Sequence, residues 1–322
     1  MLQKDAPDVS VFVPALNEES NIALVAQKIA AGCNAAGASF EIVFVDDGSR
    51  DGTLEAMKQA RSGQPDKIRI FRHRVPRGIT EAMNTAFQHV RGRVVIWIPA
   101  DLESDPETDI PLLLAKMTEG DLDVVCGWRQ ERGDGKSWSS TLYNGLGRVM
   151  FGADVHDMNW IKAFRRECLE DLRLRSDWHR FLVMIWAAQG FRIGEVHTQW
   201  HARHSGESKF GRTGIWRALS MVIDMLVVKF HVSFLRRPMM VFGPAGGVLF
   251  AAGAASGLHL LMYRLAEGYV GNRLPLVLLA AFLMLVGIQF VAFGIVAEMV
   301  VTLREDMHRL HHSSATRHVE VE

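Results

Sequence analysis

Two long apolar segments near the end of the chain restrict its architecture more than any other feature of the sequence. Pro238–Tyr263 carries no charged residue, and Leu274–Leu303 carries a single one, Glu298. Each segment exceeds the roughly 20 residues that an α-helix needs to cross a bilayer. The turn between them is short, which predicts a transmembrane hairpin of two helices over residues 238–303. A pair of buried helices in a soluble protein is the alternative interpretation.

Charged residues around this hairpin predict its orientation. Basic residues precede the first segment and follow the second: Lys229, Arg236, Arg237, Arg304, Arg309 and Arg317. The turn holds only Arg264 and Arg273, offset by Glu267. The positive-inside rule therefore places both termini in the cytoplasm, with residues 304–322 as a cytoplasmic tail. The polar start of the chain shows no signal-peptide pattern, so we expect a two-span inner-membrane protein with a cytoplasmic N-terminal domain.

Three further features of the membrane part are open to more than one interpretation. Trp216–Phe234 is amphipathic with a basic end, so residues 213–237 are predicted to form interfacial helices on the membrane surface. Glu298 either reaches the lipid interface or takes a structural or lipid-contacting role, because an isolated carboxylate is costly in a membrane. The pairs Gly243/Gly247 and Gly253/Gly257 permit close helix packing, within the hairpin or between protomers.

The first two-thirds of the chain alternate between short apolar runs and helical patterns. The runs predicted as strands are Val9–Pro14, Phe40–Val45, Ile68–Phe71, Val94–Ile98, Asp123–Gly127 and Arg192–His197. Helices are predicted over Ser20–Ala36, Asp51–Arg61, Gly78–Val90, Pro106–Met117, Ser139–Phe151 and Asp177–Gln189. This alternation predicts an α/β fold with a mostly parallel sheet. Ligands of such sheets bind beyond the carboxyl ends of the strands.

The bulk composition excludes some classes of protein. The formal net charge of the 322 residues is zero, which gives no support to a nucleic-acid-binding protein. The three cysteines lie far apart, without a CxxC or Cys/His cluster, so neither a zinc site nor a disulfide framework is predicted.

Polar residues follow the first two predicted strands. Pro14, Leu16 and Glu18 come after the first strand, and Asp46 and Asp47 stand before a glycine turn after the second. Adjacent aspartates can accept hydrogen bonds from a nucleobase N–H and from ribose hydroxyls. Taken alone, the aspartates could also form only an Asx-turn.

Four carboxylates follow the fourth predicted strand in the stretch IWIPADLESDPE. Asp101 and Glu103 stand two apart on an extended segment, where they can converge on Mg²⁺ or Mn²⁺ and so bridge to a diphosphate. Asp105 and Glu107, on either side of Pro106, have the pattern of a helix start. We therefore assign the first two carboxylates to a metal site and the last two to a helix N-terminus.

These elements, in this order, carry a resemblance to a known family. The stretches are VFVPALNEESNI, IVFVDDGSRDGT, RGITEAMNTAF, PADLESDPE, DMNWIKAFRREC, DWHRF and HARHSGESKFG. The chain resembles glycosyltransferase family 2 of the GT-A fold, whose sheet is Rossmann-like. It is most similar to the polyprenyl-phosphate glycosyltransferases, which include dolichol-phosphate mannose synthases and bacterial undecaprenyl-phosphate enzymes with a membrane hairpin. The resemblance covers residues 9–212, which we take as the catalytic domain within residues 1–212.

The resemblance implies a role for each matching residue. Pro14, Leu16, Glu18, Asp46 and Asp47 would hold the nucleotide. Asp101 would be a metal ligand and Glu103 would lie near the metal. Arg129 and Lys162 fall where the family places basic groups near the active site, and Arg203, Ser208 and Lys209 match the motif that holds the acceptor phosphate. Asp101, Arg203 and Lys209 would thus carry the catalysis. Pro99 departs from the family, which usually has aspartate there; Glu103, in place of a neutral glutamine, could restore the lost charge.

The implied activity is the inverting transfer of a sugar from a nucleotide-diphosphate sugar to a polyprenyl phosphate. A phosphate monoester is largely ionised at neutral pH, because its second pKa is near ~6, so it needs no strong general base. By analogy with the family, the protein would be a homo-oligomer, namely a tetramer. A processive polysaccharide synthase is a second interpretation, although the chain lacks the QxxRW motif of those enzymes. A third is a membrane-anchored pseudo-glycosyltransferase with a binding or scaffold role, which Pro99 favours.

Overall fold

The computed structural model describes residues 6–129, 138–170, 172, 174–201, 215–230, 238–269 and 273–317. The chain divides into two compact units, Met1–Met225 and Leu226–Glu322, and each is described by itself. The division falls within helix α7 (Ile215–Lys229), whose described side chains include the exposed Ile223, Leu226 and Val227. The domain boundaries at residues 212 and 237 stay predictions.

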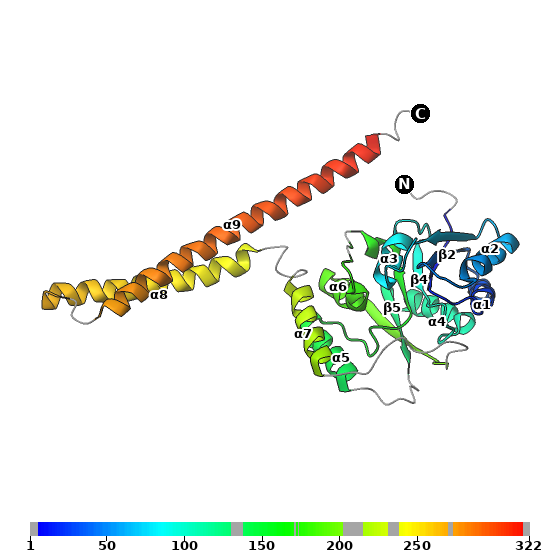
Figure 1. The fold of residues 1–322 in the computed structure, drawn as a ribbon, viewed down its shortest axis with the longest axis horizontal. Helices are drawn as coiled ribbons and strands as arrows, with labels where there is room; N and C mark the ends of the chain where they lie inside the picture. Colours follow the sequence, from blue (N-terminus) through cyan, green and yellow to red (C-terminus); the bar gives the residue numbers. More distant parts are fainter. Residues whose placement is uncertain are drawn as a thin grey trace. The chain divides into compact units, whose positions relative to one another are not determined.

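The first unit alternates strands and helices, as the sequence predicts (Figure 1). Its strands are β1 (Val9–Ala15), β2 (Phe40–Asp46), β3 (Ile68–Arg72), β4 (Val94–Trp97), β5 (Val124–Arg129), β6 (Lys162–Arg165) and β7 (Ile193–Thr198). Its α-helices before α7 are α1 (Ile22–Ala35), α2 (Thr53–Gly63), α3 (Ile79–Phe87), α4 (Pro106–Glu119), α5 (Trp138–Phe151) and α6 (Leu182–Gln189). The helix predicted over Asp177–Gln189 is divided, because a short 3₁₀ turn at Trp178–Phe181 precedes α6.

The seven strands form one sheet in the order β3-β2-β1-β4-β6-β5-β7. Strand β6 runs antiparallel to β4 and β5, whereas the other neighbouring pairs are parallel. The prediction of a mostly parallel sheet in an α/β fold is confirmed. Because β6 is reversed, its first residue, Lys162, lies level with Trp97 near the carboxyl end of β4.

Helices cover both faces of this sheet, as two neighbouring residues of β6 show. Successive side chains of a strand point to opposite faces. Ala163 belongs to the buried cluster that also contains residues of α1 and α4. Phe164 instead contacts Phe87 of α3 and Trp186 of α6, with ring centroids 5.8 Å and 4.7 Å away. Burial on both faces explains why every residue of β2 is buried and why that strand is so apolar.

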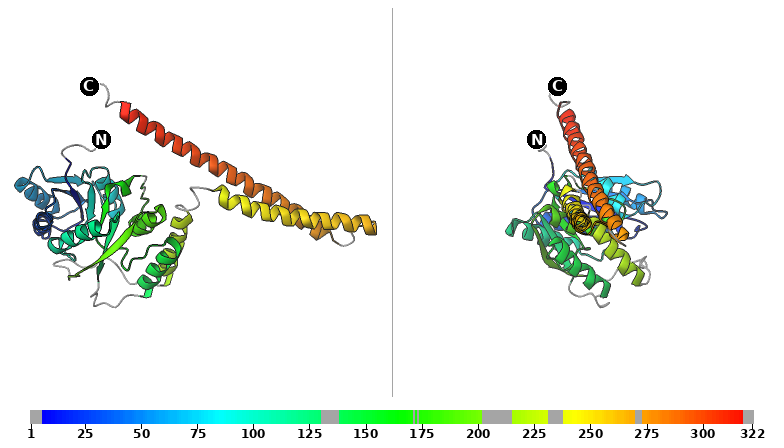
Figure 2. Two further views of the ribbon diagram at one scale, coloured as in Figure 1. Left: turned by 180° about the vertical axis from the view of Figure 1, so that it is seen from behind. Right: turned by 90° about the vertical axis from the view of Figure 1, so that its left-hand side faces the viewer.

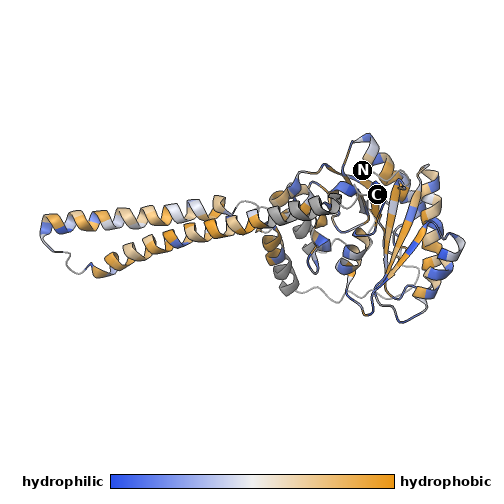
Figure 3. Ribbon diagram, turned by 90° about the horizontal axis from the view of Figure 1, so that it is seen from above, coloured by the Kyte–Doolittle hydropathy of each residue, from blue (hydrophilic) through white to orange (hydrophobic). Residues whose placement is uncertain are grey.

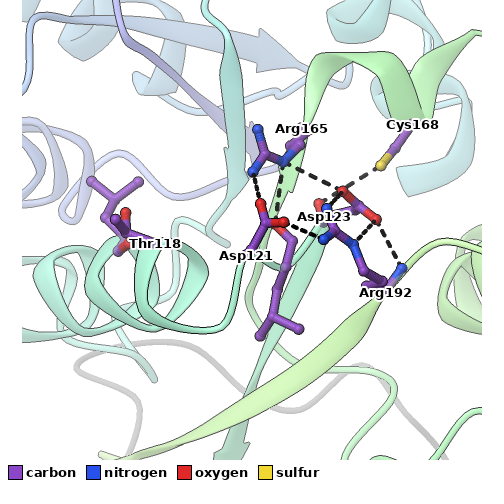
Figure 4. Close-up of polar contacts among 8 residues, drawn as sticks. Thr118, Asp121, Asp123, Arg165, Cys168 and Arg192 are labelled. Atoms are coloured by element: carbon purple, nitrogen blue, oxygen red, sulfur yellow. Dashed lines mark hydrogen bonds and ion pairs between the residues drawn. The ribbon is translucent and has the colours of Figure 1, made fainter.

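A network of ion pairs closes the amino end of the sheet, around the starts of β5 and β7 and the end of β6 (Figure 4). The Asp123 carboxylate accepts from the backbone N–H of Arg192 at 2.9 Å and from its guanidinium at 3.0 Å. Arg165 pairs with Asp121 at 3.2 Å and with Asp123 at 3.4 Å. The hydrogen bond from Arg192 holds the pKa of Asp123 below its ordinary value. This end is therefore fixed by charge, and the opposite, carboxyl end carries the polar residues of interest.

The second unit is a helical hairpin. Helices α8 (Met239–Glu267) and α9 (Leu274–Arg317) pack side by side, as Figure 2 shows. Both are long and apolar enough to span a membrane, and their apolar residues are visible in Figure 3. These two helices fit a membrane-bound protein. Helix α9 continues past Leu303 to Arg317, so most of the predicted tail is helical.

Glu298 joins the two helices of the hairpin. Its Oε2 accepts a hydrogen bond from the backbone N–H of Met239 at 3.2 Å. Met239 is the first residue of α8, and the first N–H groups of a helix have no acceptor within the helix. Of the roles that the sequence left open for Glu298, the structure shows the structural one.

Glycines form the contact between α8 and α9, but only one of the predicted glycines takes part. A Cβ atom on Gly253 would lie 2.8 Å from the Ala280 carbonyl oxygen, whereas Gly247 and Gly257 have nothing within 4 Å. Gly246, outside both predicted pairs, faces Gly287 instead: a Cβ on Gly246 would lie 2.6 Å from the Gly287 carbonyl oxygen. The GxxxG spacing therefore predicted close packing correctly for Gly253 and missed Gly246.

Gly287→Ala should destabilise the hairpin by about 1–3 kcal/mol, the usual cost of overpacking. The new Cβ would lie 2.6 Å from the Phe250 backbone nitrogen, and a backbone atom in a helix has little freedom to move away. Thermal unfolding of the full-length protein in detergent measures the effect. Gly247→Ala is the matched control, because its Cβ would meet open space. Equal melting temperatures for the two variants would contradict the packing described above.

Candidate active site

The loops that follow β1 and β2 interlock at the carboxyl end of the sheet. The backbone N–H of Asn17 donates to Ser49 Oγ at 2.9 Å, and that of Glu18 donates to Thr53 Oγ1 at 2.8 Å. The backbone N–H of Asp47 donates to the Ala15 carbonyl at 2.9 Å. The predicted nucleotide residues lie in the last residues of β1 and β2 or on the loops that follow them, at one edge of the sheet: Pro14, Leu16, Glu18, Asp46 and Asp47.

Asp46 is buried and keeps one carboxylate oxygen without a hydrogen bond. Its Oδ1 accepts from the Ser49 backbone N–H at 2.8 Å. Its Oδ2 lies 3.2 Å from Arg72 Nε but in a geometry that makes no hydrogen bond, so this buried oxygen has no hydrogen-bond donor. Buried polar atoms are almost always paired, and an unpaired one points to a missing water, ion or ligand. Asp46 is thus suited to accept a hydrogen bond from a bound molecule.

Asp47 differs from Asp46, because both oxygens of its carboxylate have hydrogen-bond partners within the protein. Oδ1 lies 2.7 Å from His73 Nδ1 and accepts from the Arg77 backbone N–H at 2.9 Å. Oδ2 accepts from the Gly78 backbone N–H at 2.8 Å. Both side chains of the Asp47–His73 pair are buried. Asp47 therefore fixes the loop between β3 and α3 over the end of β2.

This loop, residues 73–78, is the part of the site that the sequence did not predict. It packs directly on Gly48, where a Cβ would lie 2.7 Å from the Pro76 nitrogen and where φ is +80°. His73 Nε2 also lies 2.9 Å from Thr85 Oγ1 in α3. The loop carries the exposed side chains of Arg74 and Arg77 beside the aspartates. The basic residues of the stretch RHRVPRG could have indicated that this loop binds a carboxylate. Their partner Asp47 is distant in sequence, so the contact itself was not predictable.

Asp101 and Glu103 flank a tight turn after β4. Both are half-buried, and Leu102 between them has φ +58°. The backbone N–H of Glu103 donates to Asp101 Oδ1 at 3.2 Å. The backbone N–H of His201, beyond β7, donates to the Glu103 carbonyl at 2.9 Å, which places the chain after β7 beside the turn after β4. Arg203, Ser208 and Lys209 follow this contact in sequence and lie outside the described residues.

The remaining carboxylates of this stretch begin a helix, as predicted. Asp105 is the N-cap of α4, where its side chain accepts from the Glu107 backbone N–H, and Pro106 is the first helical residue. Lys28 of α1 pairs with Asp105 at 2.8 Å. Asp109 accepts in turn from the Asp105 backbone N–H at 3.0 Å, and burial raises the pKa of Asp109 to about 7. The predicted helix start at Asp105 is confirmed. The stretch with Asp101 and Glu103 is a turn and not the extended segment that the sequence predicts, and its metal site stays a prediction.

Arg129 and Lys162, predicted near the acceptor phosphate, are both covered by protein. Arg129 Nε donates to Asp157 Oδ2 at 2.7 Å, and its guanidinium lies 4.1 Å from the ring centroid of Trp160. Lys162 is completely buried. Their contact with a phosphate stays a prediction.

The carboxylates of the turn after β4 fit one divalent cation together with a substrate. Within the described ranges, no group of three His, Cys, Asp or Glu side chains could hold a metal ion. Mg²⁺, however, is commonly bound by only one or two carboxylates, with substrate phosphates and water completing its six oxygen ligands. Asp101 and Glu103 supply this donor set, so a metal here would depend on a bound diphosphate.

Comparison with known families identifies the fold and its relatives. The family model "Glycosyl transferase family 2" matches residues 10–192, which is more than half of the chain. The chain belongs to glycosyl transferase family 2. The matched range runs from the second residue of β1 to just before β7, so it includes the carboxyl ends of β1, β2 and β4.

Two curated relatives of this family match nearly the whole chain. The dodecaprenyl-phosphate galacturonate synthase of Rhizobium johnstonii is 31% identical over 91% of this chain and 87% of its own length. The undecaprenyl-phosphate 4-deoxy-4-formamido-L-arabinose transferase of Pseudomonas aeruginosa is 32% identical over 93% of this chain and 86% of its own length. The similarity thus extends through the helical hairpin.

A solved structure confirms the GT-A-like fold. Glucosyl-3-phosphoglycerate synthase from Mycobacterium tuberculosis, in complex with Mn²⁺, uridine diphosphate and glucosyl-3-phosphoglycerate, superposes with a TM-score of 0.53. The alignment covers 70% of this chain and 81% of that one, at 20% sequence identity. At this identity the comparison shows the fold alone.

Proposed function

We propose that this protein transfers a sugar from a nucleotide-diphosphate sugar to a polyprenyl phosphate, with inversion and with the help of Mg²⁺ or Mn²⁺. The observation that carries the proposal is the meeting of three elements at one edge of the sheet. They are the buried free oxygen of Asp46, the carboxylates of Asp101 and Glu103, and the contact between Glu103 and His201. The relatives named above carry out this class of reaction on dodecaprenyl and undecaprenyl phosphate.

The residues have distinct parts in this reaction. Asp46 accepts a hydrogen bond from the nucleotide, and Pro14, Leu16 and Glu18 line the neighbouring loop. Asp47 acts indirectly by holding residues 73–78 in place. Asp101 and Glu103 hold the metal, which when bound stabilises the charge that develops on the leaving diphosphate.

The acceptor needs to be positioned but not deprotonated. A polyprenyl phosphate is largely ionised at neutral pH, because its second pKa is near ~6. Its oxygen attacks the anomeric carbon directly, and the single displacement inverts the configuration there. Arg203, Ser208 and Lys209 would hold this phosphate through charge-assisted hydrogen bonds. Arg129 is paired with Asp157 and Lys162 is completely buried, so neither is included in this set. The contact between His201 and Glu103 supports this assignment, since the acceptor motif follows it directly in sequence.

The helical hairpin would keep the enzyme at the membrane that contains its lipid acceptor. We propose that it spans the inner membrane twice, with the catalytic domain and both termini in the cytoplasm. The basic residues around the hairpin support this orientation. A tetrameric assembly, expected by analogy with the family, belongs to the same proposal.

Calorimetric binding of UDP, GDP, CDP and dTDP to the detergent-purified protein, with and without Mn²⁺, tests the proposed site. We expect one nucleotide to bind, and to bind more tightly with Mn²⁺, because Asp101 and Glu103 would hold a metal that offsets the charge of the diphosphate. Binding that is the same without metal would contradict the metal site. Failure of all four nucleotides to bind would contradict the proposed function.

A second candidate is a pseudo-glycosyltransferase that binds a partner or a lipid without catalysis. One observation favours it: Pro99 stands where the family usually has aspartate. The same calorimetric experiment separates the two functions, because a pseudo-enzyme with a decayed metal site would show no Mn²⁺ dependence.

A further inference from the structure

Lys162 is a buried cation at the edge of the sheet that carries the candidate site. Its side chain is 0% exposed. It is the first residue of β6, opposite Trp97 of β4 on one side and Cys126 of β5 on the other. Since β6 is antiparallel to both strands, Lys162 lies at the carboxyl end of β4, as does the turn with Asp101, and level with the middle of β5.

Lys162 and Trp97 together present hydrogen-bond donors that have no acceptor. The Lys162 ammonium has three N–H groups, of which one donates to the Trp160 carbonyl at 2.8 Å. The ammonium also lies 4.1 Å from the ring centroid of Trp97. Among the described residues, no carboxylate forms an ion pair with it. The Trp97 indole Nε1 is buried and has no hydrogen-bond partner either. Among the described residues, two ammonium protons and the indole proton therefore have no oxygen or nitrogen acceptor at this buried place.

Burying the Lys162 ammonium without an ion pair lowers the stability of the protein when no ligand is bound. Burial lowers the pKa of Lys162 to about 8, because removal from water destabilises the charged form of the ammonium. The neighbouring carboxylate of Asp157 is already bound to Arg129 at 2.7 Å. An apolar side chain of similar length would fill the same space without this penalty. Buried charges that the fold does not need are frequent at functional sites.

The order of the strands indicates which part of a substrate meets Lys162. Along the edge, Asp46 ends β2, the turn with Asp101 and Glu103 follows β4, and Lys162 begins β6, the next strand beyond β4. A nucleotide-diphosphate sugar has its parts in the same order: base, diphosphate, sugar. With the base at Asp46 and the diphosphate at Asp101, the sugar reaches the region of Lys162 and Trp97.

We propose that Lys162 and Trp97 bind the carboxylate of an acidic sugar, so that the donor is a nucleotide-linked uronic acid. The inference rests on the proposed function and specifies its donor. One ammonium matches the single charge of a carboxylate, whereas the acceptor phosphate carries nearly two. Arg129 cannot supply the second positive charge, because Asp157 neutralises it. The two free ammonium protons and the indole N–H fit the oxygens of one carboxylate.

The test compares two donors that differ only at C6 of the sugar. Full-length protein in detergent, with polyprenyl phosphate, is assayed with UDP-galacturonate and UDP-galactose, or with their counterparts on the base found by calorimetry. We expect kcat/KM to favour the galacturonate donor. Lys162→Met should lower the use of that donor by about tenfold to a hundredfold, the effect of losing a charged hydrogen bond, and leave the galactose donor unchanged. Trp97→Phe should give a smaller loss with the same selectivity, because it keeps the ring but removes the N–H.

Three controls make the outcome specific. Lys67→Met removes a second lysine that lies over an aromatic ring, 4.3 Å from the Phe40 centroid, but is exposed at the other end of the sheet; it should change neither donor. Asp101→Asn should lower the use of both donors by about 100- to 1,000-fold, so failure of the proposed function differs from failure of this inference. Lys162→Arg keeps the charge and should keep the preference if Lys162→Met does not fold.

The pH dependence gives a readout in the unmodified protein. Preference for the acidic donor should fall as the pH rises through about 8, where Lys162 loses its proton. Of the titratable groups that act on Lys162, Arg129 and Asp157 are paired with each other. Burial raises the pKa of Cys126 to about 12 and lowers that of the nearby His179 to about 4, so neither titrates in this range.

Equal use of both donors by the unmodified protein would overturn the inference. So would a Lys162→Met variant that raises the KM for polyprenyl phosphate without changing the donor ratio, because Lys162 would then serve the acceptor phosphate.

Discussion

Asp101→Asn should lower the rate of sugar transfer by about 100- to 1,000-fold, the usual effect of losing one electrostatic contact to a developing charge. The substitution removes a metal-binding charge. It keeps the side-chain oxygen that accepts from the Glu103 backbone N–H, so the turn after β4 should stay folded. Transfer to polyprenyl phosphate and nucleotide binding with Mn²⁺, measured on the same preparation, check both parts of the prediction.

Asp105→Asn is the matched control for this experiment. Asp105 lies in the same acidic stretch, but it caps α4 and pairs with Lys28. Asparagine is as good an N-cap as aspartate, and the ion pair with Lys28 is partly exposed, so the control should lose less than about 1 kcal/mol of stability. Its transfer rate and metal dependence should be unchanged. Normal transfer by Asp101→Asn, or an equal loss in both variants, would refute the metal site.

Asp47→Ala should destabilise the catalytic domain by about 3–5 kcal/mol, because it removes one partner from a buried, charged hydrogen-bond network. Without the carboxylate, the backbone N–H groups of Arg77 and Gly78 and the ring of His73 lose their acceptor. The loop over β2 should come free, and nucleotide binding should weaken with it. Urea or thermal unfolding measures the first effect, and calorimetry measures the second.

Asp46→Asn, at the neighbouring position, should weaken nucleotide binding while changing stability little. Asparagine can still accept from the Ser49 backbone N–H, and the other carboxylate oxygen makes no hydrogen bond, so stability should change little. Nucleotide binding should weaken about tenfold or more, because a charged acceptor is lost. If Asp47→Ala instead left stability intact and removed only nucleotide binding, Asp47 would contact the nucleotide directly, as the family resemblance implies.

Local patterns were sufficient to predict most elements of the catalytic domain. Apolar runs of strand length gave β1 to β5 and β7 to within two residues at either end, because a strand buried on both faces needs such a run wherever it lies in the sheet. The sequence Asp105-Pro106 predicted the start of α4, since a cap and its helix are adjacent in the chain. β6 was seen only as a strand-like stretch around Lys162, and its reversed direction was not predicted.

Contacts between residues distant in sequence were less predictable. GxxxG spacing predicted that glycines pack α8 on α9, but the helix rotation that selects Gly246 and Gly287 depends on both helices together. Asp47 had the pattern of a nucleotide ligand, and nothing near it in sequence indicated that His73, Arg77 and Gly78 would use its carboxylate. Glu298 had no assigned partner until the hairpin placed it at the N-terminus of α8.

The sequence by itself determined the alternating α/β domain, the two apolar helices and the helix start at Asp105. Each of these depends on residues within one or two turns of chain, where periodicity, charge and capping act directly. The tertiary structure alone decided that Asp47 holds a loop, that one buried oxygen of Asp46 has no hydrogen bond, and that Lys162 is buried against Trp97 with no ion pair among the described residues. These depend on the order and direction of the strands, which set the neighbours of each strand end and which hydrophobic periodicity does not encode.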